Sequence, residues 1–477
     1  MSSASPSRRR PAPVTPASAA VCVALMLAGC SSTTPATSVR STSGDVPFTG
    51  CGTVACTGEI DGATYEIRLP EKWNGTLLLY SHGYRQARPA PPNFEPVSTE
   101  PQVAATDEVA SQLVAKGYAL AGSAYASNGW AVADGVKAGE QLRGFFVDKV
   151  GKPNRTYVWG DSLGGLITQT LAEKHAEWVD GAAPMCGVLG GSNLNLDMAL
   201  DIAFVVKTLI HPRLKLTGYA SYEEAVQNFR GAYDAILAAT KSVQIGVPKL
   251  LLGAAVTDAP TQTARFDGST PTSRVSAIVE ALVTGLGYGT VGRWEIEQRV
   301  GGNPSGNAGV DYSARVSAEE RALLETVSAG STDRLLGQLA GTTQRVAPDD
   351  AARAAFDTLG NPTGKLTVPT ITLHTKADPL VLVQNETVFR QRVLASRDRS
   401  GDLVQLYTVA PATYPAPAPY GAGHCNFTVP ERIGVITLLD GWVRGGVYPA
   451  GPAVDAAFSG DKGISKAYAP GPWPAAG

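Results

Sequence analysis

Patterned charge is largely missing from this chain of 477 residues. The net charge is −2, charged residues make up 17% of the sequence, and no basic stripe or run of like charges occurs. A nucleic-acid or polyelectrolyte partner is therefore not indicated. No internal repeat of solenoid length is present either. The length, with 44% hydrophobic residues, 33 prolines and 52 glycines, predicts a loop-rich globular protein that has either one large domain with a sizeable insertion or two domains.

The N-terminal region lacks an apolar run long enough to cross a bilayer as a helix. Three arginines at residues 8–10 precede an apolar segment at residues 19–28, which is the pattern of a targeting segment. The segment ends in Leu-Ala-Gly-Cys at residues 27–30, which resembles the bacterial lipobox. That resemblance implies that residues 1–29 are a lipoprotein signal peptide and that Cys30 is lipidated.

The same resemblance implies a mature protein outside the cytoplasm, held at a membrane by the lipid on Cys30. Residues 30–46 are rich in serine and threonine and are expected to form a flexible tether. Ordinary cleavage near Gly29, followed by secretion, is the alternative.

The sequence has few cysteines, so each can be assigned an expected role. Of six cysteines, one lies in the targeting segment and Cys30 is the expected lipid site. The other four suit disulfides in an oxidising compartment, and four cysteines allow three pairings. Cys51 and Cys56 are near enough in sequence to close a small loop, which leaves Cys186 and Cys425 to pair. A zinc site is the alternative, but no C-x-x-C spacing supports it.

Strands and helices alternate in two separated parts of the chain. In the first part, strands are expected at residues 63–69, 75–80, 118–124, 155–159 and 179–185. Helices are expected at residues 104–116 and 163–173, and a further helix follows residue 130 and ends at about residue 142. The second part has expected strands at residues 367–375 and 403–409 and helices at residues 384–396 and 431–443. This alternation predicts a parallel α/β sheet. Between the two parts the pattern is mainly helical, most clearly at residues 197–210, 222–239 and 319–339.

A G-x-S-x-G motif stands at residues 160–164, between the expected strand and the expected helix. Ser162 therefore falls on a sharp strand-to-helix turn, a nucleophile elbow. The motif's glycines would let the turn tighten and the helix pack against the strand. The turn also places the Leu163 backbone N–H at the positive end of a helix, where an oxyanion is stabilised. Taken alone, the motif is also compatible with a chance turn in a glycine-rich chain.

Histidine is scarce, so candidates for a general base are few. A serine nucleophile needs a base, and the base needs an orienting acid. His424 lies in a glycine-rich loop at residues 420–427, after the last expected strand, and such a loop brings an imidazole over the elbow. Asp378 follows an expected strand by a short turn and is the predicted acid. Asp161 is expected to point away from the base and to accept a structural hydrogen bond. The other four histidines are weaker candidates for the base, namely His82, His175, His211 and His374.

The order Ser162, Asp378, His424, together with the elbow, resembles the α/β-hydrolase superfamily. The resemblance covers residues 63–186 and 367–443. It implies a mostly parallel, doubly wound sheet in two core parts, residues 47–186 and 366–450. A mainly helical cap at residues 187–365 would be inserted before the acid-bearing strand. Residues 451–477, rich in proline, glycine and alanine, would form a tail that is ordered only where it packs on the body.

The resemblance also implies two oxyanion donors and supports one disulfide. The loop after the expected strand at residues 75–80 would supply the Tyr84 backbone N–H, or that of Gly83, as the partner of the Leu163 N–H. Cys186 and Cys425 would meet at the carboxyl edge of the sheet. Tannases and feruloyl esterases also have a cysteine beside the catalytic histidine, but they bridge it to a cysteine just before the serine. Here that position is Asp161, so the pattern is broken.

These residues together predict an exported serine hydrolase that cleaves carboxylic esters through an acyl-enzyme on Ser162. No metal or cofactor is needed for that chemistry. The expected partners are a small or polymeric ester and a membrane, and Trp130 is a candidate to line the substrate pocket. The alternatives are a serine peptidase of the aminopeptidase kind and a non-catalytic surface lipoprotein. An acidic cluster in the cap would favour the peptidase; the pairs at residues 319–320 and 349–350 are weak candidates for one.

Overall fold

The computed structural model describes residues 56–341, 344–396, 400–415, 421–458, 463–465 and 467–474. The predicted signal peptide at residues 1–29, the tether at residues 30–46 and the predicted lipid site Cys30 lie outside the described residues. Cys56 is disulfide-bonded, and Cys51, its predicted partner, also lies outside them.

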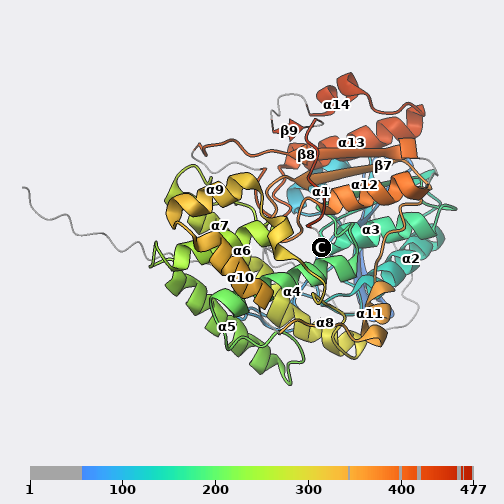
Figure 1. Ribbon diagram of the computed structural model, residues 1–477. Helices are drawn as coiled ribbons and strands as arrows, with labels where there is room; N and C mark the ends of the chain where they lie inside the picture. Colours follow the sequence, from blue (N-terminus) through green and yellow to red (C-terminus); the bar gives the residue numbers. More distant parts are fainter. Residues whose placement is uncertain are drawn as a thin grey trace, which may run out of the picture.

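A nine-stranded sheet organises the larger part of the described chain, in the order β1-β2-β4-β3-β5-β6-β7-β8-β9 (Figure 1). The strands are β1 (Cys56–Ile60), β2 (Ala63–Arg68), β3 (Thr76–Ser81), β4 (Ala119–Ser123), β5 (Arg155–Asp161), β6 (Gly181–Met185), β7 (Thr370–Thr375), β8 (Leu403–Thr408) and β9 (Ile464–Ser465). Neighbouring strands from β4 to β8 pair in parallel, whereas the pairs at the two edges are antiparallel. The carboxyl ends of the parallel strands therefore meet along one edge of the sheet.

Helices cover both faces of this sheet because successive residues of a strand point to opposite faces. On β3, Leu77 and Leu79 belong to the hydrophobic layer that includes α2 and α3, while Leu78 and Tyr80 belong to the layer that includes α1 and α13. The core helices are α1 (Asp107–Ala115), α2 (Val132–Lys149), α3 (Leu163–Lys174), α12 (Asn385–Ser396), α13 (Val429–Gly445) and α14 (Gly451–Ala457). This two-sided burial explains why β3 is a continuous apolar run.

The segment between β6 and β7 is helical, and we call it the cap. Its helices are α4 (Ser192–Leu209), α5 (Tyr222–Ala239), α6 (Gly246–Thr257), α7 (Pro271–Gly287), α8 (Arg293–Val300), α9 (Ala318–Val327), α10 (Ser331–Gly341) and α11 (Asp350–Asp357). A π-helical turn, η1 (Tyr288–Gly292), joins α7 to α8, and a 3₁₀ turn, η2 (Tyr312–Arg315), precedes α9. A second 3₁₀ turn, η3 (Ser400–Asp402), lies in the core before β8. Most of the cap helices gather beside the sheet-containing core (Figure 1).

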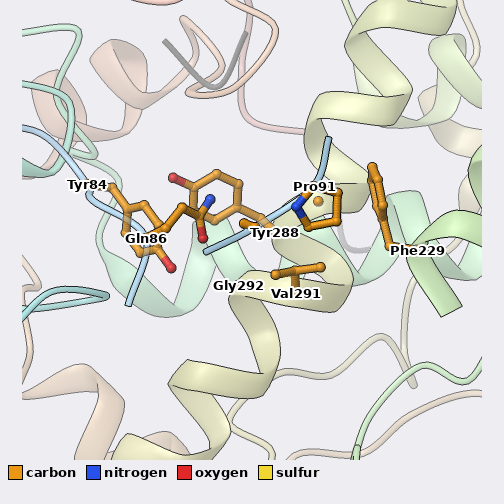
Figure 2. A pocket seen from close by; sticks show the side chains of 9 residues that line it. Tyr84, Gln86, Pro91, Phe229, Tyr288, Val291 and Gly292 are labelled. Atoms are coloured by element: carbon orange, nitrogen blue, oxygen red, sulfur yellow. The ribbon is translucent and has the colours of Figure 1, made fainter. Parts of the chain in front are cut away.

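The cap meets the core along the loop that follows β3. Tyr84 of this loop and Tyr288 of η1 lie with their ring centroids 5.1 Å apart (Figure 2). The Tyr222 hydroxyl donates to the Pro89 carbonyl, and the Arg88 guanidinium lies 4.9 Å from the Trp294 ring centroid. Such a cation–π contact adds to apolar packing. These contacts fix the cap against the loop.

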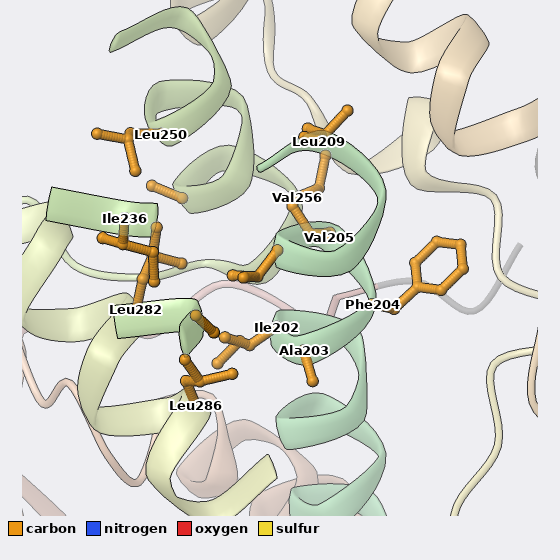
Figure 3. Close-up of a cluster of buried hydrophobic side chains, with 14 of the residues drawn as sticks. Ile202, Ala203, Phe204, Val205, Leu209, Ile236, Leu250, Val256, Leu282 and Leu286 are labelled. Carbon is orange, nitrogen blue, oxygen red and sulfur yellow. The ribbon is translucent and has the colours of Figure 1, made fainter. Parts of the chain in front are cut away.

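The cap has its own hydrophobic core, separate from the two layers of the sheet (Figure 3). Ile202 and Val205 of α4 pack there with Ile236 of α5, Leu250 of α6 and Leu282 of α7. The run Pro271–Val300 is long and apolar enough to cross a membrane by length and composition, but 67% of its most apolar window is buried inside the protein. It therefore serves here as a core helix of the cap.

Most predicted elements agree with the structure, and the differences have physical causes. The single helix predicted at residues 319–339 is wrong, because Gly330 takes a left-handed φ of 71° between α9 and α10. In the tail, α14 packs on α13 through Val454 and Phe458, which are buried. The predicted fold class is confirmed: the mostly parallel sheet, the turn between β5 and α3, and the helical insertion before β7 form an α/β-hydrolase fold.

Candidate active site

Ser162 sits at the turn between β5 and α3, at the carboxyl edge of the sheet. Its φ of 59° lies in the left-handed region, which is costly for a residue with a side chain. A Cβ added at Gly164 would come within 2.0 Å of the Ser81 carbonyl oxygen, so only glycine lets α3 approach β3 this closely. The strained turn lifts the Ser162 side chain off the sheet, and the residue remains 8% exposed.

The structure brings the three predicted chemical groups together in a chain of hydrogen bonds. The Ser162 Oγ lies 2.8 Å from Nε2 of His424, and Nδ1 of the same ring lies 2.8 Å from Oδ2 of Asp378. Serine comes from the elbow, the acid from the loop after β7, and histidine from the loop before α13. These elements are far apart in sequence and meet only because the strands are parallel. A base within hydrogen-bond reach of the serine and an acid within reach of the base is the geometry that nucleophilic catalysis requires.

Asp378 is fully buried and held in place by backbone donors. Its Oδ1 accepts hydrogen bonds from the N–H groups of Leu380 and Val381 at 2.8 and 2.9 Å. Burial alone would raise the pKa of Asp378, but the charge and hydrogen bonds of His424 and His374 hold this pKa well below its ordinary value. Asp378 is therefore a carboxylate, able to hold the His424 ring in one orientation.

A disulfide joins Cys186, directly after β6, to Cys425, directly after His424. The predicted pairing is confirmed, with the two Cα atoms 5.4 Å apart and 239 residues between them in sequence. Both cysteines take left-handed φ angles, as do Ser162 and Tyr125. Non-glycine residues with such backbone angles gather at functional sites. The bridge anchors the histidine loop to the strand beside the elbow strand.

An ion pair provides a second link between the elbow and the histidine loop. The carboxylate of Asp161 accepts from the Tyr80 hydroxyl and from Nη1 of Arg432, which lies 2.6 and 2.7 Å from its two oxygens. Nη2 of Arg432 donates to the Cys425 carbonyl at 3.0 Å. Asp161 thus acts as the structural hydrogen-bond acceptor that the sequence suggested. Arg432 was not predicted, because its place on α13 carries no local signal.

His374 lies beneath Asp378, enclosed by two carboxylates. Its Nδ1 is 3.2 Å from Glu386, and its Nε2 is 3.6 Å from Oδ2 of Asp378 and 2.8 Å from the Val381 carbonyl. Burial lowers the pKa of His374, but the hydrogen bonds and charges of Asp378 and Glu386 raise it more, to about 10. The coupling of His374 to Glu386 was not predicted, because no local pattern connects Glu386 to the site.

The two residues named for the oxyanion hole, Tyr84 and Leu163, both line the pocket beside Ser162. Leu163 is the first residue of α3. A Cβ on Gly83 would lie 3.3 Å from the Ser162 Cβ, so the loop after β3 passes directly over the elbow. His82 steadies this loop, since Nδ1 lies 2.6 Å from the Gly83 carbonyl and the ring stacks on Tyr125. Burial, then the charge of Arg85, lowers the pKa of His82 to about 3.

A pocket opens from Ser162 under the cap and is lined mainly by apolar side chains. The empty space in and in front of it, open solvent included, measures about 660 Å³. Trp130 forms part of the wall while its Nε1 donates to the Ser192 hydroxyl at 2.9 Å. Ile202 and Leu196 of α4 line the cap side. Among the described residues that line it, none carries a carboxylate, ammonium or guanidinium group.

One residue of each acidic pair considered for an amine site, at residues 319–320 and 349–350, caps the start of a helix instead. Glu320 forms a capping box with Ser317 at the start of α9, and Asp349 caps the start of α11. Neither residue lines the pocket beside Ser162. Among the residues that the structure describes, no group of three or more His, Cys, Asp or Glu side chains is placed to hold a metal ion.

No protein-family model and no curated protein matches this sequence. Among solved structures, the rice cell wall degrading esterase LipA from Xanthomonas oryzae is similar at 12% identity, with 72% of this chain and 77% of that chain covered and a TM-score of 0.31. Feruloyl esterase B from Aspergillus oryzae is similar at 14% identity, over 81% and 78% of the two chains, with a TM-score of 0.35.

Proline iminopeptidase from Mycobacterium smegmatis is similar at 11% identity, over 82% of this chain and 98% of that chain, with a TM-score of 0.34. Likeness at this level does not carry an inference of activity or substrate. The chemistry of this chain is therefore inferred from its own residues.

Proposed function

We propose that this protein is a serine hydrolase that cleaves uncharged carboxylic esters. The observation that carries the proposal is the hydrogen-bonded series Ser162–His424–Asp378, which opens into a pocket without charged side chains. The strained elbow and the disulfide beside His424 add support, since both fix the reacting groups without a cofactor. Preorganisation of this kind is worth more than any single contact in such a site.

The proposed reaction has two halves. Nε2 of His424 takes the Ser162 proton as Oγ attacks the acyl carbon, and Asp378 stabilises the imidazolium that forms. The backbone N–H groups of Leu163 and Tyr84, or of Gly83 in place of Tyr84, hold the oxyanion. His424 then gives its proton to the leaving alcohol. A water molecule, deprotonated by the same imidazole, attacks the acyl-enzyme; the bond from the acyl carbon to Ser162 Oγ breaks, His424 returns the proton to Oγ, and the acid leaves.

The peptidase alternative receives no support from the pocket. An aminopeptidase must hold a substrate ammonium group, and a buried ammonium without a paired carboxylate is costly. The wall residues that the structure describes supply no carboxylate. The ester is therefore the better substrate class.

Labelling with a fluorophosphonate probe, followed by mass spectrometry of the modified peptide, tests the proposal. The label is expected on Ser162, with competition by p-nitrophenyl butyrate.

Ser162→Ala should lower ester turnover by at least about a thousandfold, and Asp378→Asn should lower it by about 10³–10⁴-fold. Ser98→Ala, at an exposed serine, is the matched control. A folded protein that takes no label, or a label on another serine, would refute the assignment; faster turnover of aminoacyl amides than of esters would favour the peptidase.

We also propose that the protein acts at a membrane surface, with Cys30 lipidated and residues 1–29 removed. Support comes from the lipobox-like sequence alone. Cys30→Ala should move the protein from the membrane to the soluble fraction of the producing cells. Continued membrane retention of that variant would contradict the lipid anchor.

A further inference from the structure

The cap segment that joins α6 to α7, residues 258–270, contacts the core at the loops of the acid and the base. None of its residues, all of which the structure describes, lines the pocket beside the nucleophile. Oδ2 of Asp258 accepts from the Gln384 side-chain amide at 3.0 Å, at the end of the loop between β7 and α12, here called the acid loop. A Cβ added at Gly423, in the histidine loop, would lie only 3.0 Å from the Cβ of Ala264. The segment therefore meets both loops.

Tyr414, between β8 and α13, lies at the centre of this contact region. It is half-buried and packs on a small cluster of buried alanines that includes Ala377 and Ala422. These two alanines pair in a parallel β-bridge, so the acid loop and the histidine loop meet at this point. Ala377 directly precedes Asp378, and Ala422 stands two residues before His424. Tyr414 thus packs where the backbones that carry the acid and the base are joined.

The same residue is tied to the cap by two hydrogen bonds. The Tyr414 hydroxyl donates to the Thr263 carbonyl at 2.7 Å, and its backbone N–H donates to Oδ2 of Asp267 at 3.3 Å. Thr263 is buried, and its own hydroxyl donates to Glu280 of α7 at 3.1 Å, which fixes the acceptor on the cap. Burial, followed by the charges of Asp267 and Glu280, raises the pKa of Tyr414 to about 12. The hydroxyl therefore keeps its proton and remains a donor at neutral pH.

We propose that Tyr414 is a positioning residue, through which the cap holds the acid loop and the histidine loop in place beside Ser162. The ring supports the two loops, and the hydroxyl links that support to the cap. Reacting groups depend on such support from residues that do not touch the substrate, since a misplacement of about 1 Å can cost about a hundredfold in rate. The effect on rate rests on the ester hydrolysis proposed above. The cap would then act on the reaction in addition to lining the pocket.

Two substitutions separate the ring from the hydroxyl. Tyr414→Phe keeps the packing on the alanines and loses the donor to the cap, whereas Tyr414→Ala loses both. For p-nitrophenyl butyrate, kcat should fall about threefold to tenfold in Tyr414→Phe and about tenfold to a hundredfold in Tyr414→Ala. KM should stay within about twofold of wild type, because Tyr414 does not line the pocket. An unchanged kcat in folded Tyr414→Ala, or a change confined to KM, would overturn the proposal.

Tyr222→Phe is the matched control. The Tyr222 hydroxyl also donates across the boundary between cap and core, to the Pro89 carbonyl at 2.8 Å, but it does so at the loop after β3. The kcat of this variant should stay within about twofold of wild type. An equal fall in kcat in Tyr222→Phe and Tyr414→Phe would show that general attachment of the cap sets the rate, and the specific role of Tyr414 would be refuted.

Hydrogen exchange distinguishes failure of this proposal from failure of the proposed function. The Gly423 N–H donates to the Ala377 carbonyl at 2.9 Å. Exchange in a peptide that covers residues 421–427 should be at least about tenfold faster in Tyr414→Ala than in wild type, and unchanged in Tyr222→Phe. Faster exchange in a protein that hydrolyses no ester would support the link and refute only the proposed function. Unchanged exchange in Tyr414→Ala would overturn the link whether or not esters are hydrolysed.

Discussion

The elbow and the histidine loop lie side by side but are held by different forces. The elbow is fixed by close packing, because Gly164 allows an approach to the backbone of Ser81 on β3 that no side chain would permit, and Ser162 takes a strained φ in the turn. The histidine loop has local hydrogen bonds, such as that from the Asn426 side-chain amide to the Ala422 carbonyl, but it also depends on contacts to distant elements. It is held by a disulfide to the end of β6, by the Arg432 contact to the Cys425 carbonyl, and by the Gly423 N–H, which donates to the Ala377 carbonyl.

This difference matters for the proposed reaction, in which Ser162 is the nucleophile and His424 the base, because both must be placed within about 0.5 Å. A misplacement of about 1 Å can cost about a hundredfold in rate. The nucleophile is positioned by sterics, which act regardless of solvent or redox state. The base is positioned by cross-links that chemistry can break. We therefore expect damage to the elbow to affect folding first, and damage to the loop to affect turnover first.

The largest expected effect comes from placing a side chain in the elbow. In Gly164→Val the added Cβ would fall 2.0 Å from the Ser81 carbonyl oxygen and 2.6 Å from that of His82. Backbone atoms cannot yield as a flexible side chain does, so the free energy of unfolding should drop by at least about 3 kcal/mol. Urea denaturation followed by circular dichroism measures the change.

The matched control for that experiment is Gly441→Val on α13, where an added Cβ meets no atom within 4 Å. Its unfolding free energy should stay within about 0.5 kcal/mol of wild type. Equal effects at residues 164 and 441 would show that the elbow is not sterically determined.

An effect on stability of similar size and a clearer effect on turnover are expected for the loop. Replacing both Cys186 and Cys425 by alanine removes a cross-link between residues 239 apart. The expected loss of unfolding free energy is roughly 2–5 kcal/mol. At temperatures where the variant is still folded, ester turnover should fall because His424, next to Cys425, loses its anchor. Turnover equal to wild type at full folding would show that the bridge does not position the base.

The contrast between the two halves also separates what the sequence predicts from what it does not. The elbow, the alternation of strands and helices, and the residues Ser162, Asp378 and His424 leave local patterns: a short motif, apolar runs and a glycine-rich loop. The pairing of Cys186 with Cys425 followed from counting and from the parallel topology. Most of these features could be predicted because their signals lie within a few residues of the position concerned.

Other parts of the site depend on contacts that no local pattern encodes. Arg432 reaches Asp161 across 271 residues, and Glu386 meets His374 only because α12 packs behind β7. Tyr288 reaches the pocket because η1 interrupts a long helical run, which neither its apolar spacing nor its glycines indicated. The break between α9 and α10 was missed because Gly330 is one glycine among many.

The last and weakest effect concerns His374, the buried side chain next to Asp378. The pKa of His374 is raised from 6.5 to about 10 in the folded protein, since Asp378 and Glu386 more than offset the cost of burial. A raised pKa means that the folded state binds the proton more tightly than the unfolded state. The resulting stability is fully present below about pH 6.5 and is lost as the pH rises through about 10.

His374→Gln keeps a hydrogen-bonding side chain but cannot take the charge. The difference in unfolding free energy between wild type and this variant should therefore shrink between pH 6.5 and 10, by a few kcal/mol at most. Denaturant titrations at a series of pH values measure it. A difference that is constant over this window would show that His374 is neutral in the fold, and that Asp378 is held by its backbone donors and by His424 alone. A shrinking difference would mean that the acid, like the base it orients, depends on a partner supplied from outside its own loop.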